Sequence, residues 1–584
     1  MDNSACPAVL WRKARSSGRG GFSFTAAVTA LAFGGYAPNA FSAPPTLDHF
    51  YPVAIQRDAT QSISAVGKFD AWPPKIWTDA PGISITPDKE KGTLNVEVSQ
   101  DTAVGPHLVR FFNEEGSSAP RFLIVTTQPT VLETEPNDHF SKAPPIDQLP
   151  TTIDGRLGKS GDVDSYAVTL AAGQTVIASV EAYRLGSPLD AVLRLVDARG
   201  LEMAVNHDDG RTLDPALAWT AKKAGTYIVQ VFGFAFPATS AVNFTGSDAC
   251  VYRLHVSTGP QARYTLPLGL QRGHSAKLQV FGWNLGGFSG RAVDVDGSFP
   301  EDGSARAGWR RPDFENTFFL PLGDGPEWQE QDLRKGSGDS PALSPPYAIT
   351  GSIEKPEEED RFVFTAKKDE KLLFEIQSTS LGFPLDAWLA VQDKSGKELA
   401  KNDDSTDADP VLEWAAPQDG AYVAVVKSVL HRSGADHLYR LSVRPVTPDF
   451  KGVVAESGFT IEPGKTIEIK ITARRSYGFA TKLAGSVTGL PEGLTAGPFE
   501  LGEKDKEVVL KLTASAEAAP FSGPFEIQFK DENTHTAFAG VHELVSSSLR
   551  NGVPRGFRDL VITSTPGIWL TVVPPPPPKE ADKK

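Results

Sequence analysis

The sequence is poor in cysteine, with two residues among 584. Cys6 lies in an amino-terminal segment that we predict to be removed, so Cys250 would stand alone and no internal disulfide could form. We expect Cys250, which precedes the strand-like segment VYRLHV, to be a small core residue and not a reactive thiol. Stability must therefore come from hydrophobic cores, with a bound metal as a further source.

Catalytic motifs are also missing. The sequence has no GxSxG, no HExxH and no glycine-rich phosphate loop, and its ten histidines are scattered. A nucleophilic hydrolase needs Ser or Cys beside a positioned His, and a zinc hydrolase needs His residues at ligand spacing. We therefore expect no enzyme, and no unassigned segment of ~200 residues remains for a separate peptidase domain. A triad assembled from distant residues stays open as an alternative.

Long apolar runs are missing after residue 43, so we expect no membrane span in the exported chain. Residues 1–43 combine four basic side chains with the apolar stretch FSFTAAVTALAFGGYA and end in FSA, which is typical of a signal peptide cleaved after Ala43. The stretch is short of the ~20 apolar residues that span a membrane, and a retained anchor is the alternative. The predicted location is secreted, cell-surface or periplasmic.

A surplus of positive charge is missing as well. The net charge is −14, and loss of a leader that carries +3 would make it −17. Such acidity disfavours nucleic acid as a partner, because binding to phosphates depends on Lys and Arg. It suits a solvated exported protein that could hold cations.

The residues that are present indicate several β domains. Hydrophobic residues make up 40% of the chain, and short runs of Val, Thr, Phe and Leu alternate with Gly, Pro and Asp clusters. At ~100–200 residues per domain, the length suggests four or five domains. The sequence therefore predicts an all-β fold, a tandem array of jelly-roll-like and immunoglobulin-like β-sandwich domains.

An internal repeat fixes most domain boundaries. LGSPLDA at 185–191 returns as LGFPLDA at 381–387, and the same offset of 196 pairs Asp164 with Asp360. A second repeat pairs residues 52–69 with 267–284. The predicted domains are a signal peptide (1–43), a first small domain (46–130), a first large domain (131–258), a second small domain (260–327), a second large domain (328–448), a last domain (449–573) and a Pro-rich disordered tail (574–584).

Within the large domains the local pattern is strand, turn, strand. DSYAVTLAAGQTVIASVEA and AVLRLVDARGLEMAVN each alternate apolar and polar residues around a turn, and we predict two hairpins. GTYIVQV is predicted to be a central strand. Asp190 and the Asn206-His207-Asp208-Asp209 run tempt a catalytic interpretation, but we expect backbone-bonding turn residues.

The large domains carry a family resemblance. ETEPND, GDVDSYAVTL, PLDAVLRLVDARG, GTYIVQV and YRLHV, in this order, resemble the bacterial pre-peptidase C-terminal (PPC) domain family, which includes collagen-binding segments of clostridial collagenases. PLDAWLAVQDKSG, GAYVAVV and YRLSV in the second large domain look like a second member. The resemblance implies an exported jelly-roll-like sandwich, usually an accessory to peptidases and sometimes a binder of proteinaceous matrix. The small domains and the last domain are similar to immunoglobulin-like sandwiches.

The resemblance also implies a calcium site. In the collagen-binding members an acidic linker holds calcium with acidic residues from the next loop, and the matching positions are Glu133, Glu135, Asn137, Asp138, Asp162 and Asp164. Ca²⁺ takes six to eight oxygen ligands at ~2.3–2.6 Å, and without a cation these charges would repel one another. The alternative is a solvated linker in which Asn137 caps a turn.

The second large domain departs from this pattern. Glu330 and Asp332 take the first two acidic positions, but Arg334 and Lys335 take the next two. Two positive charges would oppose Ca²⁺. We therefore expect metal in the first large domain and none in the second.

Together these features predict a non-catalytic exported binding or adhesion protein that recognises an extracellular or periplasmic protein or polysaccharide, stiffened by calcium at the first large domain. Repeated domains favour multivalent binding or spacing. The alternatives are an accessory component of a secreted peptidase system, an unrecognised hydrolase, and a purely structural envelope spacer.

Overall fold

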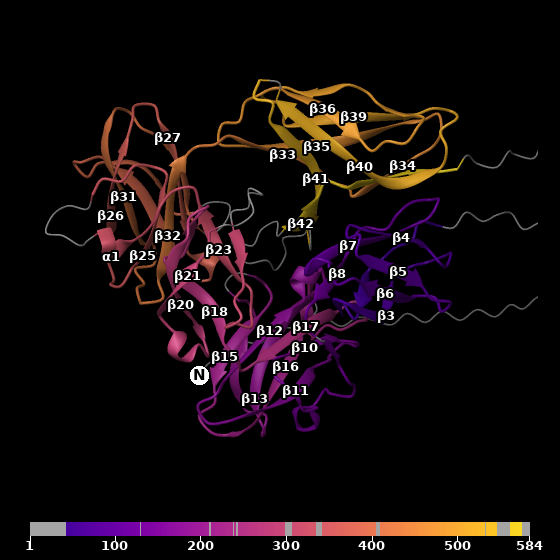
Figure 1. The fold of residues 1–584 in the computed structure, drawn as a ribbon, viewed down its shortest axis with the longest axis horizontal. Helices are drawn as coiled ribbons and strands as arrows, with labels where there is room; N and C mark the ends of the chain where they lie inside the picture. The colour runs from indigo at the N-terminus through magenta and orange to yellow at the C-terminus, as the bar shows by residue number, and fades with distance from the viewer. Residues whose placement is uncertain are drawn as a thin grey trace, which may run out of the picture. The chain divides into compact units, whose positions relative to one another are not determined.

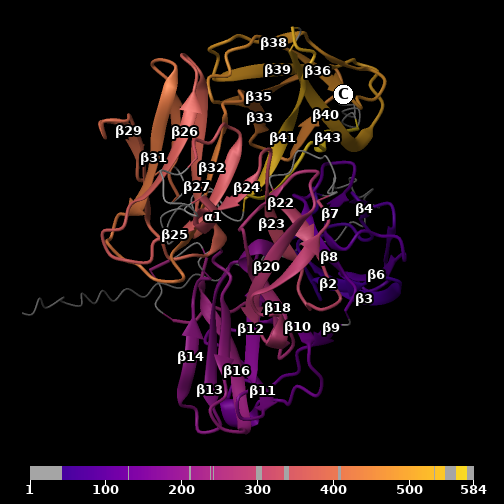
Figure 2. The same cartoon turned by 60° about the vertical axis from the view of Figure 1, so that its left-hand side comes forward.

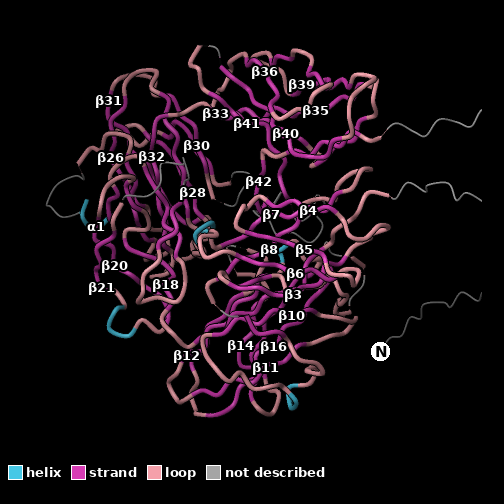
Figure 3. The backbone as a smooth tube through the Cα atoms, turned by 45° about the vertical axis from the view of Figure 1, so that its right-hand side comes forward, coloured by secondary structure: helices cyan, strands magenta, loops and turns pink. Residues whose placement is uncertain are grey.

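The computed structural model describes residues 43–574, with gaps at 129, 210–211, 237–238, 241–242, 298–305, 334–340, 405–408, 532 and 546–560. Almost all of its regular structure is β-strand (Figure 3). The predicted signal peptide lies outside the described residues except for Ala43, and so do the tail from 575 and most of the polar segment before the last strands. In the described part, no helix is long and apolar enough to cross a membrane.

The first small domain is a sandwich of two four-stranded sheets. One sheet has the order β1 (His49–Tyr51), β3 (Ala59–Val66), β6 (Thr93–Val98), β5 (Ile83–Pro87), and the other β2 (Ala54–Gln56), β8 (Arg121–Thr126), β7 (Gly105–Phe112), β4 (Lys75–Thr78). In β6, TLNVEV alternates so that Leu94, Val96 and Val98 are buried. This period of two places one face of the strand in the core.

The first large domain has a five-stranded and a four-stranded sheet (Figure 1). The first has the order β15 (Ala216–Thr220), β12 (Thr175–Glu181), β17 (Val251–Ser257), β10 (Thr151–Arg156), β9 (Thr130–Leu132), and the second β11 (Asp164–Leu170), β16 (Gly225–Ala235), β13 (Leu189–Asp197), β14 (Glu202–Asn206). Two 3₁₀ turns, η1 (Phe140–Lys142) and η2 (Tyr183–Leu185), connect strands. Both sheets contribute to one core, in which Cys250 is buried as predicted.

One of the two predicted hairpins is wrong. β11 pairs with β16, whereas β12 pairs with β15 and β17, so these consecutive strands lie in opposite sheets. A strand with alternating apolar and polar residues can turn its apolar face to the core from either sheet of the sandwich. The pattern therefore could not identify the strand with which it pairs. The other hairpin is confirmed, because β13 and β14 pair antiparallel. β16 is a central strand, as predicted.

The second large domain repeats this topology. Its sheets have the orders β24 (Glu327–Gln329), β25 (Tyr347–Ser352), β32 (Leu438–Pro445), β27 (Lys371–Gln377), β30 (Val411–Ala415) and β26 (Asp360–Ala366), β31 (Gly420–Ser428), β28 (Ala387–Gln392), β29 (Glu398–Asn402). The short elements are α1 (Glu330–Leu333) and η4 (Thr379–Leu381). β9 and β24 each begin one residue ahead of the predicted domain boundary, and each adds a parallel edge strand.

The second small domain has two three-stranded sheets. Their orders are β18 (Gln261–Leu266), β20 (Ala276–Trp283), β21 (Arg291–Val295) and β19 (Leu270–Gln271), β23 (Phe318–Gly323), β22 (Arg306–Trp309), with the 3₁₀ turn η3 (Gly286–Phe288). The separate sheets of the described residues confirm the predicted all-β tandem array of sandwich domains.

The last domain, orange to yellow in Figure 2, is built from eleven strands. They are β33 (Asp449–Val454), β34 (Gly458–Ile461), β35 (Thr466–Ser476), β36 (Leu483–Thr488), β37 (Leu494–Ala496), β38 (Phe499–Leu501), β39 (Glu507–Ala514), β40 (Phe521–Asp531), β41 (Ala537–Val545), β42 (Val561–Thr565) and β43 (Ile568–Val572). The predicted final strand is β43, which pairs with β34 and β40.

A buried carboxylate organises the 3₁₀ turn of each large domain. Asp214 accepts hydrogen bonds from the backbone N–H groups of Ala182 (2.8 Å), Tyr183 (2.6 Å) and Arg184 (3.2 Å) around η2. Asp409 accepts from three consecutive N–H groups at residues 378–380 around η4. These N–H groups have no partner within so short a turn, so the carboxylate replaces water for them.

Candidate metal centre

The six predicted ligand residues lie on the linker after β9 and on the loop that leads into β11. Glu133 follows β9, and its N–H donates to the Asp154 carbonyl (3.1 Å), which extends the pairing of β9 with β10. Asp164 is the first residue of β11, and Asp162 precedes it in the turn. The strand ends therefore fix both backbone segments that carry the acids.

The structure brings the acids of the two segments together. Glu135, Asp162 and Asp164 each offer a carboxylate oxygen, and these oxygens lie within 4.8 Å of one another. Glu133 lies close enough to Asp164, and Asp138 to Asp162, to affect the acidity of its neighbour. Without a cation, so close a set of carboxylates would repel one another.

Several buried polar atoms of this group lack a hydrogen-bond partner. The side chain of Asn137 is fully buried, and neither its Oδ1 nor its Nδ2 is hydrogen-bonded. The Oδ1 atom of Asp164 is buried without a hydrogen-bond partner too, and that of Asp162 has only the Lys159 ammonium beside it, at 3.6 Å. An unsatisfied buried group costs ~1–3 kcal/mol. Hard oxygen atoms of this kind fit a calcium ion, which would compensate that cost.

Burial and mutual repulsion shift the acidity of the group. Burial, followed by the charge of Glu133, raises the pKa of Asp164 to about 9. Burial also raises the pKa of Glu133 and, together with the hydrogen bond to Asp138, that of Asp162. Folding thus makes ionisation of these three acids costly. A divalent cation bound among them would favour the ionised carboxylates and lower their pKa values.

These shifts predict the pH dependence of the metal-free chain. An unfolded Asp titrates near ~3.9, whereas folded Asp164 keeps its proton up to a pKa of about 9. The folded state therefore binds more protons in this window, and stability must fall as pH rises. We expect the melting temperature in chelator to decrease from pH 5 to pH 9, and to decrease less in saturating calcium. A calorimetric series that is flat or rising in chelator contradicts this.

Lys159 is a cation already present at the edge of the group. Its Nζ lies 3.0 Å from Asp138 Oδ1 and 3.6 Å from Asp162 Oδ1, and its side chain is 61% exposed. An exposed ion pair contributes little, ~0–1 kcal/mol. Asp138 is nevertheless directed toward this lysine, so among the six predicted ligands it has the weakest support.

The second large domain keeps part of the arrangement. Ser352 N–H donates to Glu330 Oε2 (3.2 Å), as Arg156 N–H donates to Glu133 Oε2 (2.9 Å). Glu358, at the position of Asp162, accepts from the N–H groups of two residues in its own loop, as Asp162 accepts from Lys159 N–H (3.3 Å). Arg334 and Lys335 lie outside the described residues. Within the described ranges, both groups of side chains able to hold an ion belong to the first large domain.

Tyrosines that the sequence reasoning missed complete the group. Tyr252 Oη donates to Asp164 Oδ2 (2.5 Å), and Tyr166 Oη lies 2.6 Å from Tyr252 Oη. The phenol of Tyr252 lies over Gly155, where a Cβ would approach it to 2.3 Å. Tyr439 repeats the bond to Asp360 (2.7 Å) in the second large domain. The joint repetition of glycine, aspartate and tyrosine was the signal that could have identified them.

Comparison with known proteins gives one local sequence similarity. No protein-family model matches the chain. An 85-residue stretch is 38% identical to a probable subtilase-type serine protease of Deinococcus radiodurans. This stretch makes up 14% of this chain and 12% of that protein. The match spans far less than two thirds of the relative, so it does not assign the relative's activity to this chain.

Solved structures resemble the chain only weakly. Three of them are tripeptidyl peptidase 2 (10% identity, TM-score 0.15, covering 85% of this chain and 40% of that one), the fibronectin(III)-like modules of Clostridium thermocellum CbhA (13% identity, TM-score 0.11, covering 30% and 92%) and domains 1–6 of the surface layer protein SbsC (9% identity, TM-score 0.14, covering 85% and 54%). TM-scores this low carry no conclusion about function.

Proposed function

We propose that the chain is an exported, non-catalytic binding or adhesion protein whose first large domain is a PPC-like sandwich stiffened by calcium. The observation that carries the proposal is the group of acids at the domain junction, with buried oxygens on Asn137 and Asp164 that lack a hydrogen-bond partner. Glu133, Glu135, Asn137, Asp162 and Asp164 would hold the ion, with Asp138 at its edge. Calcium supplies positive charge that joins the linker to the β11 loop.

The duplicated pair of small and large domains supports a binding role. Two copies of one scaffold can engage a repetitive ligand twice, and such avidity needs no deep cleft. A protein ligand is the first expectation and a polysaccharide the second. The proposed location is secreted, cell-surface or periplasmic, in keeping with the leader-like residues 1–43 and with the acidic charge of the chain.

The test is a binding screen with the full chain immobilised. Panels of peptides, matrix proteins and glycans are passed over it in calcium and in EGTA. We expect a protein ligand to be retained, with weaker retention in EGTA because the junction loses its ion. Absence of binding across the panels in both buffers contradicts the proposal.

A second candidate function is an accessory role in a secreted peptidase system. The stretch shared with a probable subtilase-type serine protease favours it, because PPC-like domains accompany peptidases. Purified chain is incubated with casein and ester substrates, alone and with a subtilase. Faster cleavage only in the presence of the subtilase supports the accessory role. Turnover by the chain alone, abolished by one point substitution, would contradict both proposals.

A further inference from the structure

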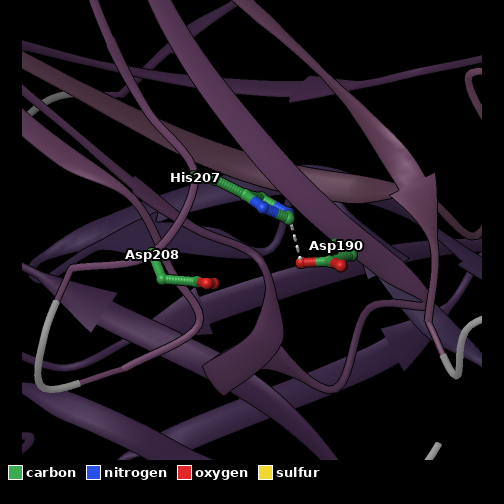
Figure 4. A group of neighbouring side chains, drawn as sticks. All are labelled: Asp190, His207 and Asp208. Atoms are coloured by element: carbon green, nitrogen blue, oxygen red, sulfur yellow. Dashed lines mark ion pairs between the residues drawn. The ribbon is translucent and has the colours of Figure 1, made fainter. Parts of the chain in front are cut away.

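A second group of possible ligands lies at the other sheet of the first large domain. Asp190, His207 and Asp208 each direct one ligand atom into the same small space, and these atoms lie within 4.8 Å of one another (Figure 4). His207 Nε2 is 3.1 Å from Asp190 Oδ1. Their burial is intermediate for the two acids, whereas the imidazole is 46% exposed.

The β13–β14 hairpin brings these residues together. Leu193 on β13 lies opposite Asn206 on β14, and the strands run antiparallel. Continuing this register places His207 and Asp208 beside the first residues of β13, where Asp190 lies. Asp190 is therefore a strand residue, and the predicted turn role for it is wrong. Asn206 does bond to backbone, since its Oδ1 accepts from Ala216 N–H (3.2 Å).

A surface ion pair does not account for the whole group. A protonated His207 beside Asp190 would form an ordinary pair of ~0–1 kcal/mol. Yet the Oδ1 atom of Asp208 is buried without a hydrogen-bond partner, and Asp190 Oδ1 has only the His207 ring nitrogen beside it. A buried carboxylate oxygen that shares a space with a ring nitrogen but accepts from no donor lacks the partner that buried polar atoms ordinarily have.

The donor atoms indicate which ion would fit. The predicted calcium ligands all offer oxygen, whereas this group offers one imidazole nitrogen and two carboxylate oxygens. Calcium prefers oxygen, and imidazole suits zinc and other first-row transition ions. Three protein ligands also match zinc sites that leave one position for water.

We propose that Asp190, His207 and Asp208 form a second metal site of the first large domain, one that takes a first-row divalent transition ion such as Zn²⁺ and not calcium. The site uses none of the six predicted calcium ligands, so it stands independently of the proposed function. The second large domain has Asp403 at the position of His207, and this lack of a nitrogen ligand predicts that it has no such site.

The test uses the full metal-free chain in saturating calcium, titrated with Zn²⁺ by calorimetry and with Co²⁺ by visible absorption. We expect one Zn²⁺ per chain, and bound Co²⁺ should show d–d absorption that Zn²⁺ abolishes. His207→Ala should weaken Zn²⁺ binding by about 100-fold or more, since loss of a second-shell partner alone costs 10–100-fold. Calcium binding should not change.

Matched variants keep the outcome decisive. His274→Ala removes an exposed histidine outside the group and should leave Zn²⁺ binding unchanged. His207→Asp copies the second large domain and should lose Zn²⁺ as the alanine variant does. If His207→Ala melts abnormally in chelator, Asp208→Asn replaces it with the same expected loss. The proposal is overturned if the wild type binds no Zn²⁺, if calcium displaces it, or if these variants bind as tightly as the wild type.

Discussion

Replacing Asp164 with asparagine is expected to abolish the stabilisation by calcium while leaving the calcium-free chain at least as stable as the wild type. In the wild type, an ion that binds only the folded state adds ~2.7 kcal/mol at a hundred times its Kd. Asp164 is fully buried, and burial, followed by the charge of Glu133, raises its pKa, so its charge is costly without the ion. The asparagine amide oxygen can still accept the hydrogen bond from Tyr252.

The measurement is a pair of calorimetric unfolding scans of the full chain, in calcium and in EGTA, for each variant. Asp360→Asn is the matched control, because Asp360 has the same tyrosine partner in the second large domain. We expect this control to keep the full response to calcium. A calcium response retained in Asp164→Asn would remove the buried acid group as the binding site. A response lost in both variants would point to the shared tyrosine contact instead.

Replacing Asp214 with alanine is expected to destabilise the first large domain by about 2–4 kcal/mol, since a buried backbone N–H that loses its acceptor costs ~1–3 kcal/mol and water recovers part of the loss. Three backbone N–H groups around η2 would lose their acceptor, and Arg184 Nε would lose a carboxylate 2.8 Å away. The substitution also leaves space beside the turn, and a single water there would replace only part of the three lost hydrogen bonds.

Urea unfolding of the full chain, followed by hydrogen exchange resolved to peptides, localises this loss. We expect the amides of residues 182–184 and of β12 to exchange faster in Asp214→Ala. Asp147→Ala removes an exposed acid from the same domain and should change stability by less than ~0.5 kcal/mol. Equal behaviour of the two variants would show that the buried carboxylate is dispensable.

Periodicity predicted the fold class well and strand partners poorly. Alternation in TLNVEV identifies a strand with one buried face, and the repeated motifs identify the duplicated domain. The same alternation could not reveal that β11 and β12 lie in opposite sheets, because the pairing partners are distant in sequence. Pairing between distant segments depends on the whole core, and no local pattern encodes it.

The candidate calcium site was also predictable only in part. The acids of the linker could be identified because clustered carboxylates and a proline stand out in sequence. The contact of Tyr252 with Asp164 spans 88 residues, and in the sequence only the repetition of both residues in the second large domain points to it. Asp190 was mistaken for a turn residue because short polar side chains that bond to the backbone are common in hairpin turns, although Leu189 and Asp190 already belong to β13.

The placement of β9 has a mechanical consequence. β9 is the edge strand through which the chain enters the first large domain, and its parallel ladder with β10 has only three residue pairs. Tension on the preceding segment would load this short ladder before it reaches the sandwich core. The acids immediately after β9 approach the first residue of β11, a strand of the opposite sheet. An ion held there would fasten the entering strand to both sheets, so resistance to pulling would vary with the calcium concentration of the surroundings.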